Sequence, residues 1–206
     1  ENPAAPHNPE EAPLTEYRRM GSEHFLHIAY FVDNPDAASD LEQDPRNFLR
    51  KVYWTLSGAV DFFDMFAFPP GTTYIDAMVE PPSLPWPWLS ELEMEVFVNE
   101  YSQCGFSGGL NWYHSMDMKW EQRKAYEGIQ SEVPAWFIGS EADVDLEGFH
   151  GDDPISQMRA IFPNLMDVQM IPKVGHMVQL EASEELNIIL LDYLDRIKQQ
   201  QTRTAP

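Results

Sequence analysis

The sequence predicts an α/β protein in which a helical part comes first and a shorter strand–loop–helix part follows. Helix start and stop signals dominate the first 130 residues, whereas short apolar runs typical of strands occur only after them, at Val133–Gly139 and Val168–Ile171. Each run is followed by a turn, as expected for buried parallel strands joined by helices. We therefore expect a loop or tail over 1–13, a helical part over 14–130, and part of an α/β core over 131–206.

Capping signals divide the first half of the helical part. The apolar residues between Leu14 and Phe31 predict helical turns that break near Gly21. The stretch Asp36–Thr55 predicts a helical hairpin. Its second helix is expected to start at Pro45, with Asp44 as the N-cap, because proline suits the first helical position and aspartate accepts from free N–H groups there.

The second half of the helical part follows an aromatic, proline-rich connector over Phe62–Pro87 that has no strand pattern. A helix is predicted from Ser90, its N-cap, to about Gln103, and Gly105 is expected to stop it. A further helix is predicted from Leu110 to about Tyr126, and an amphipathic segment over Ala182–Ile197 closes the chain.

Composition excludes several classes of partner. The chain has 206 residues, is 43% hydrophobic and carries a formal net charge of −21. Nucleic acid and anionic membranes would repel this charge, and no apolar run reaches the roughly 18 residues that span a bilayer. Cys104 is the single cysteine, so no intramolecular disulfide is expected and a cytoplasmic location is predicted.

A histidine near the C-terminus is the first candidate for chemistry. His176 follows the apolar run Val168–Ile171 and the flexible Gly175, and it precedes the amphipathic segment. A histidine at such a strand-to-helix turn, with an acid on an earlier loop, is typical of the acid–base pair of an α/β-hydrolase. Asp143, after the earlier run, is the preferred acid. Its rivals on the same loop are Glu141, Asp145 and Glu147.

A nucleophile is harder to find. Ser107 lies in a G-x-S-x-G pattern over Gly105–Gly109, and Ser107, Asp143 and His176 occur in the order of a serine hydrolase. The pattern requires a buried strand directly before it, whereas Met94–Gln103 predicts a helix. We therefore expect the nucleophile to lie outside these residues. The first residues lack a starting methionine and a signal sequence, which suggests a portion of a longer protein.

The segment Gly105–Tyr113, GFSGGLNWY, resembles the lid signature of the soluble epoxide hydrolases, a family of α/β-hydrolases. The resemblance implies that 14–130 is the helical lid and that 131–206 is the C-terminal part of the core, so that the fold is an incomplete α/β-hydrolase. It covers nearly all of the chain after the first dozen residues. Three further segments carry it: Tyr30-Phe31 with Asn34-Pro35, Leu84–Leu89, and Met118–Glu121.

The resemblance also implies a reaction, the hydrolysis of an epoxide to a vicinal diol through an aspartyl ester. It implies His176 as the base, Asp143 as its orienting acid, and two lid side chains that donate a hydrogen bond to the epoxide oxygen. Tyr113 matches one lid tyrosine. The other is replaced by His27, whose donor strength would depend on pH near neutrality.

The substrate pocket is expected to be lined by Trp112, Phe31 and Trp88. Neither a cofactor nor a metal is predicted, since no Cys/His spacing suggests a metal site. The expected partners are a small epoxide, the missing N-terminal half of the same protein, and a second copy of the chain in a homodimer. The alternatives are a dehalogenase-like or serine esterase-like hydrolase, and a non-catalytic binding or dimerisation module derived from the lid.

Overall fold

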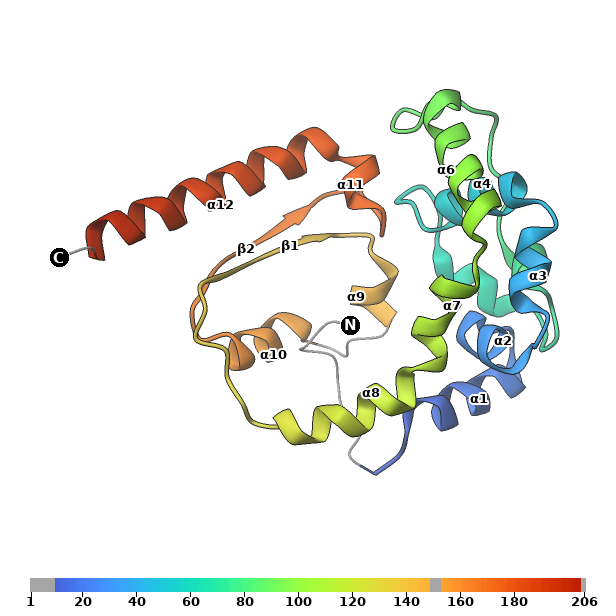
Figure 1. Ribbon diagram of the computed structural model, residues 1–206, viewed down its shortest axis with the longest axis horizontal. Coiled ribbons are helices and arrows are strands. Elements are labelled where there is room, and N and C mark those ends of the chain that lie inside the picture. The colour runs from blue at the N-terminus through green and yellow to red at the C-terminus, as the bar shows by residue number, and fades with distance from the viewer. Residues whose placement is uncertain (1–9, 149–152, 205–206) are drawn as a thin grey trace. The chain divides into compact units, whose positions relative to one another are not determined.

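The computed structural model describes residues 10–148 and 153–204, and these residues form two compact units (Figure 1). Within these ranges no helix is long and apolar enough to cross a membrane. Residues 10–56 and 60–127 are called the helical unit, and residues 57–59, 128–148 and 153–204 are called the strand unit.

The helical unit begins with α1 (Pro13–Glu23) and α2 (His27–Asp33). The expected break falls at residues 24–26, a few positions after Gly21, and the glycine itself lies inside α1. A Cβ atom on Gly21 would lie 2.5 Å from the Cβ of Ala29 in α2. The glycine therefore permits close approach of the two helices, which the sequence pattern could not distinguish from a helix stop.

The predicted helical hairpin is confirmed. Its helices are α3 (Ala37–Glu42) and α4 (Pro45–Thr55). The side chain of Asp44 accepts a hydrogen bond of 3.0 Å from the backbone N–H of Asn47, which satisfies one free donor at the start of α4.

The connector after α4 contains a 3₁₀ helix, η1 (Phe62–Ala67), and the short helix α5 (Tyr74–Ala77). Helix α6 (Glu91–Cys104) follows. Its start at Ser90 is confirmed, since Ser90 and Glu93 form a reciprocal capping box in which each side chain accepts from the other residue's backbone N–H.

The last helices of this unit are α7 (Ser107–His114), α8 (Met116–Arg123) and the 3₁₀ helix η2 (Lys124–Tyr126). The prediction of one helix over 110–126 was therefore wrong in detail. The backbone of Ser115, with φ −87° and ψ 0°, leaves the α-helical region and separates α7 from α8.

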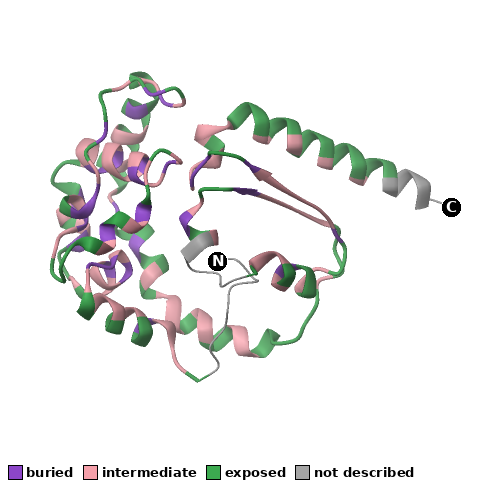
Figure 2. Cartoon of the chain, turned by 180° about the vertical axis from the view of Figure 1, so that it is seen from behind, coloured by how far each residue is buried: buried purple, intermediate pink, exposed green. Residues whose placement is uncertain are grey.

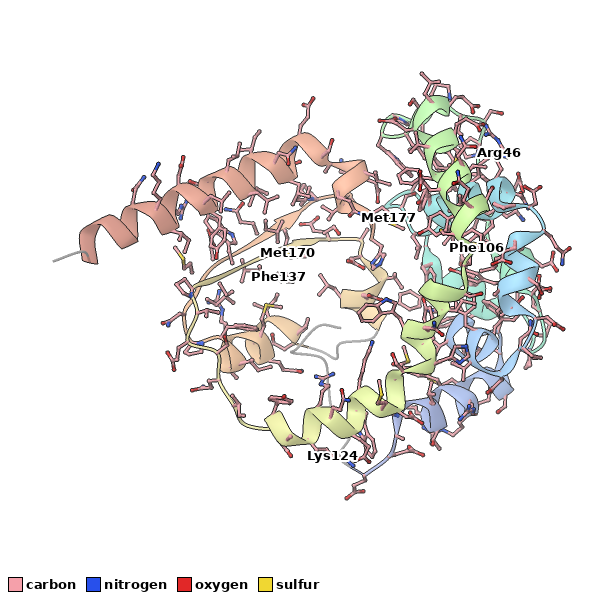
Figure 3. The ribbon with its side chains drawn as sticks, in the orientation of Figure 1. Arg46, Phe106, Lys124, Phe137, Met170 and Met177 are labelled. Atoms are coloured by element: carbon pink, nitrogen blue, oxygen red, sulfur yellow. The ribbon has the colours of Figure 1, made fainter. Side chains whose placement is uncertain are left out.

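Buried residues gather in the helical unit (Figure 2). On its surface, Arg46 of α4, labelled in Figure 3, forms ion pairs with Glu91 and Glu95 of α6. These helices also pack directly against each other. Burial of apolar side chains provides most of the stabilisation, and the most deeply buried ones are Leu26, Leu41, Leu49, Met65, Leu89 and Met94.

The strand unit is built on two parallel strands, β1 (Ala135–Ser140) and β2 (Leu165–Ile171), which confirms both predicted strands. Phe137 pairs with Val168, and this register brings the carboxyl ends of the two strands together. Side chains that follow the ends of β1 and β2 are therefore neighbours.

Four helices complete the strand unit: α9 (Val144–Gly148), α10 (Pro154–Ile161), α11 (Val178–Glu181) and α12 (Ser183–Thr204). Helix α12 lies over one face of the strand pair, whereas α10 lies over the other (Figure 1). The outer side of α12 is exposed (Figure 2).

The two faces of the strand pair carry alternating side chains, as the strand period requires. Trp136 faces α12, where its ring lies 5.5 Å from that of Tyr193. Phe137 packs on the opposite side with Met158 of α10 and Leu165. Figure 3 labels Phe137 of β1 and Met170 of β2.

Candidate active site

The carboxyl ends of β1 and β2 bring Asp143 and His176 into contact. Asp143 lies three residues after β1 ends, and His176 lies in the turn after β2. The distance from Asp143 Oδ1 to His176 Nδ1 is 2.9 Å, and the side chains are 18% and 37% exposed. Because Nδ1 bonds the carboxylate, Nε2 is the ring nitrogen left for proton transfer.

The carboxylates around His176 stabilise its protonated form. The pKa of His176 is raised above its ordinary value, chiefly by the hydrogen bond to Asp143. Burial opposes this increase, and the negative charges of Asp143, Asp145 and Glu181 add to it. An imidazole in this environment is suited to accept a proton and hold it as the imidazolium ion.

The structure distinguishes Asp143 from its rivals. Asp145 Oδ2 lies 4.0 Å from His176 Nδ1, farther than Asp143, and the side chain of Asp145 is half exposed. The backbone N–H of Asp145 donates to Asp143 Oδ1 at 3.0 Å, which helps to orient that carboxylate. Glu141 is exposed. The side chain of Glu147 lies outside the described residues.

The turn that carries His176 is held to the end of β1. The hydroxyl of Ser140, which is 1% exposed, donates a 2.6 Å hydrogen bond to the carbonyl of Gly175. The N–H of Ala142 donates to the carbonyl of Val174 at 3.0 Å. These bonds join the acid-bearing and histidine-bearing segments directly. Sequence reasoning missed Ser140, although a serine at the end of a buried strand was visible.

In the helical unit, His27 and Tyr113 come together. His27 begins α2, and Tyr113 lies near the end of α7, which packs against α2. Their ring centroids are 5.9 Å apart in an edge-to-face arrangement. The buried Phe31 also joins them, with its ring 4.9 Å from that of Tyr113. Three of the residues predicted for the lid are therefore neighbours.

Tyr74 is a member of this aromatic group that sequence reasoning missed. It is 4% exposed, and its ring lies 4.9 Å from Phe31 and 6.1 Å from His27. Burial, with a smaller contribution from Tyr113, raises the pKa of Tyr74 well above its usual range, so the phenol stays protonated. The available signal was Thr73, the N-cap of the short helix that Tyr74 begins.

The other two predicted pocket residues have different surroundings. Trp112 is 64% exposed, and the Lys119 ammonium lies 3.9 Å from its ring centroid. Trp88 is half-buried against Trp86, at 4.9 Å between ring centroids, and Trp86 in turn packs on Trp54. The structure thus assigns Trp88 to a tryptophan cluster rather than to the aromatic group around His27.

Helix α7, which carries Tyr113, is fixed at its first turn. Gly105 has φ +70°, a conformation that favours glycine, and a Cβ atom there would lie 2.5 Å from Glu42 Oε1. The same oxygen accepts a 3.0 Å hydrogen bond from the N–H of Phe106. Ser107 is exposed and follows a helix instead of a strand, so it lacks the setting of a nucleophile elbow.

The strand unit also contains a pocket of about 440 Å³. Apolar side chains of the strands and of α10, including Phe137, Met158 and Leu165, form most of its lining. The carboxyl-bearing residues Asp143 and Asp145 also line it. Part of the apolar surface of the strand pair therefore stays accessible within the described strand unit.

No family model matches the chain. Two similar proteins are epoxide hydrolases A and B of Mycobacterium tuberculosis, with 30% and 29% identity over 184 and 192 residues, which cover 88% and 82% of the chain. The chain spans only 56% and 53% of these relatives, about half of their length.

A solved structure of an epoxide hydrolase from an endophytic Streptomyces superposes with a TM-score of 0.84 at 28% identity, covering 95% of this chain and 60% of the other. The match confirms the predicted fold class, an incomplete α/β-hydrolase. Sequence and structure together show that the chain is a homologue of the epoxide hydrolases of the α/β-hydrolase fold.

Proposed function

We propose that this chain supplies the water-activating pair and the lid donors of an enzyme that hydrolyses epoxides to vicinal diols. The observation that carries the proposal is the 2.9 Å contact between Asp143 and His176 at the carboxyl ends of two parallel strands. The helical unit would be the lid, and the strand unit would be the last part of the core. The homology to epoxide hydrolases supports the reaction class.

The proposed nucleophile is an aspartate outside these 206 residues. Its carboxylate oxygen attacks an epoxide carbon, the ring C–O bond breaks, and an ester forms. The departing alkoxide takes a proton from a lid donor, Tyr113 or His27. Water then attacks the ester carbonyl while His176 Nε2 removes its proton. The ester C–O bond breaks, the leaving oxygen takes the proton of the carboxylic acid so formed, and the diol and the aspartate carboxylate are released; the imidazolium proton then returns through solvent to the deprotonated lid donor. Asp143 stabilises the imidazolium ion formed in that step.

The lid pair supports this mechanism because both donors lie in one aromatic group. The phenol of Tyr113 can donate at any pH near neutrality, whereas His27 donates strongly only when it is protonated. Tyr113 is therefore assigned the main role, and His27 the secondary one. Phe31, beside Tyr113, is proposed as an apolar wall that keeps the epoxide from bulk water.

A second candidate reaction is the hydrolysis of a carbon–halogen bond. His27 favours it, since an imidazole takes the place at which the resemblance to epoxide hydrolases implies a tyrosine. A halide leaves without needing a proton, so this reaction would not depend on the phenol of Tyr113. Removal of that phenol therefore separates the two candidates.

The test requires a parent enzyme, defined as a protein that contains this chain together with the nucleophilic aspartate. Diol formation from styrene oxide should be abolished by His176→Gln and strongly slowed by Tyr113→Phe. The exposed His114 and Tyr126 provide matched controls, so that His114→Gln and Tyr126→Phe should retain activity. Two results together would favour the second candidate. The unaltered enzyme would form no diol, and the release of halide from a haloalkane would persist in Tyr113→Phe.

A further inference from the structure

We propose that Glu181 is a positioning residue for His176, acting through the peptide that precedes the histidine and through its own negative charge. This inference rests on the proposed role of His176 as the base. Glu181 is the last residue of α11, the short helix that follows the histidine turn. Glu181 is not one of the residues proposed to contact the substrate or the ester.

The carboxylate of Glu181 bonds two backbone N–H groups of the strand unit. The N–H of Gly175 donates to it at 3.2 Å to Oε1 and 3.3 Å to Oε2, and the N–H of Gly58 donates to Oε2 at 2.9 Å. Gly175 directly precedes His176, so the first bond restrains the backbone from which the imidazole projects. Hydrogen bonds to a charged acceptor are among the stronger ones in proteins.

The second partner, Gly58, lies tightly against the histidine turn. A Cβ atom on Gly58 would lie 2.5 Å from the carbonyl oxygen of Lys173 and 3.0 Å from the nitrogen of Gly175. Both are backbone atoms and cannot move aside cheaply. Residues 57–59, which connect α4 to η1 along the chain, are therefore packed on the turn, and one carboxylate joins them to the peptide before His176.

The charge of Glu181 also acts on the imidazole. Together with Asp143 and Asp145, Glu181 raises the pKa of His176, and these three carboxylates are the charged groups that act on this ring in the described residues. A carboxylate that both fixes the turn and stabilises the imidazolium ion affects the orientation of the base and its proton affinity. A purely structural side chain would affect the orientation alone.

The two effects separate in variants. Glu181→Gln keeps the size and one oxygen acceptor but removes the charge, whereas Glu181→Ala removes both. Glu181→Asp keeps the charge on a shorter side chain and tests rescue. Glu184→Gln is the matched control. Glu184 is an exposed glutamate in the first turn of α12, and its substitution removes the same charge.

Two measurements on the 206-residue chain test the proposal without any turnover. Titration of the His176 ring by NMR should show a lowered pKa in Glu181→Gln and Glu181→Ala, an intermediate effect in Glu181→Asp, and none in Glu184→Gln. Hydrogen exchange at the Gly58 and Gly175 amides should accelerate about 10-fold or more in Glu181→Ala, the scale of one lost hydrogen bond to a charged group.

An unchanged His176 pKa in Glu181→Gln, or unchanged protection of both amides in Glu181→Ala, would overturn the proposal. If Glu181→Ala does not fold, the isosteric Glu181→Gln decides through the titration. In the parent enzyme, Glu181→Gln should lower kcat with little change in KM and shift the acidic limb of the kcat profile to lower pH. If the NMR results are as expected but the parent enzyme opens no epoxide, the proposed function is refuted and this inference stands.

Discussion

Ser140→Ala is expected to weaken the strand unit and to loosen the histidine turn. The hydroxyl donates a 2.6 Å hydrogen bond to the carbonyl of Gly175 and is 1% exposed, so water cannot replace it without local opening. Loss of this buried hydrogen bond leaves the Gly175 carbonyl without its donor. Such a loss lowers the free energy of unfolding by about 1–3 kcal/mol. The substitution removes one oxygen and creates almost no cavity, so no large packing cost adds to this value.

The assay is native-state hydrogen exchange at the amide of Ala142, which donates to Val174 across the two turns. The expected loss of protection is about 5- to 150-fold, which corresponds to the same 1–3 kcal/mol. Ser39→Ala provides the control, because Ser39 makes the same type of bond, from its hydroxyl to the carbonyl of Asp36 at 2.8 Å, on an exposed surface. Its cost should stay within about 0.5 kcal/mol. Equal costs for the two substitutions, each measured within its own unit, would refute the reasoning.

In the parent enzyme, Tyr113→Phe should slow ester formation by about 100-fold in stopped-flow measurements, the scale of a lost proton donor, and an effect no greater than that of Tyr126→Phe would contradict the role. His27→Phe should cost less and alter the pH profile of the same step; an unchanged profile would assign His27 a packing role. Asp143→Asn should lower the pKa of His176, because the hydrogen bond to Asp143 is the main cause of its increase. The pKa of His176 is higher in the folded state than in the unfolded state. The stability that Asp143 contributes should therefore be fully present below the unfolded-state pKa of histidine and should be lost as the pH rises through the folded-state pKa. Urea unfolding at several pH values can check this. The 206-residue chain alone should associate as its concentration increases in sedimentation experiments, because the strand pair leaves apolar surface accessible, and a stable monomer would contradict this.

Local signals predicted most of the helices and both strands. Asp44 with Pro45, and Ser90 with the helix after it, were recognised because a capping residue and its N–H partner lie within three positions of each other. Gly21 was misread because a glycine that ends a helix and one that lets a second helix approach look the same in sequence. The difference lies in Ala29, which a helix-stop rule does not consider.

The sequence order was enough to predict the candidate acid and base, but not the residues that hold or surround the candidate groups. The order of strand, acid, strand and histidine identified Asp143 and His176 because each follows a recognisable apolar run, and their catalytic roles stay predictions. Glu181 could not be found in this way, since its partner Gly58 is 123 residues away. Tyr74 was missed for the same reason, because only packing against α2 distinguishes it from other aromatic residues of the connector.

The most direct test of the central claim is the intact mass of the parent enzyme carrying His176→Gln after it is mixed with an epoxide. If His176 activates the water that hydrolyses the ester, the protein should gain the mass of one epoxide and keep it for many turnover times of the unaltered enzyme, with one equivalent consumed and no diol released. His114→Gln, treated in the same way, should form diol and show no lasting adduct. A His176→Gln protein that gains no mass, or that releases diol at the unaltered rate, would contradict the assignment of His176 as the base.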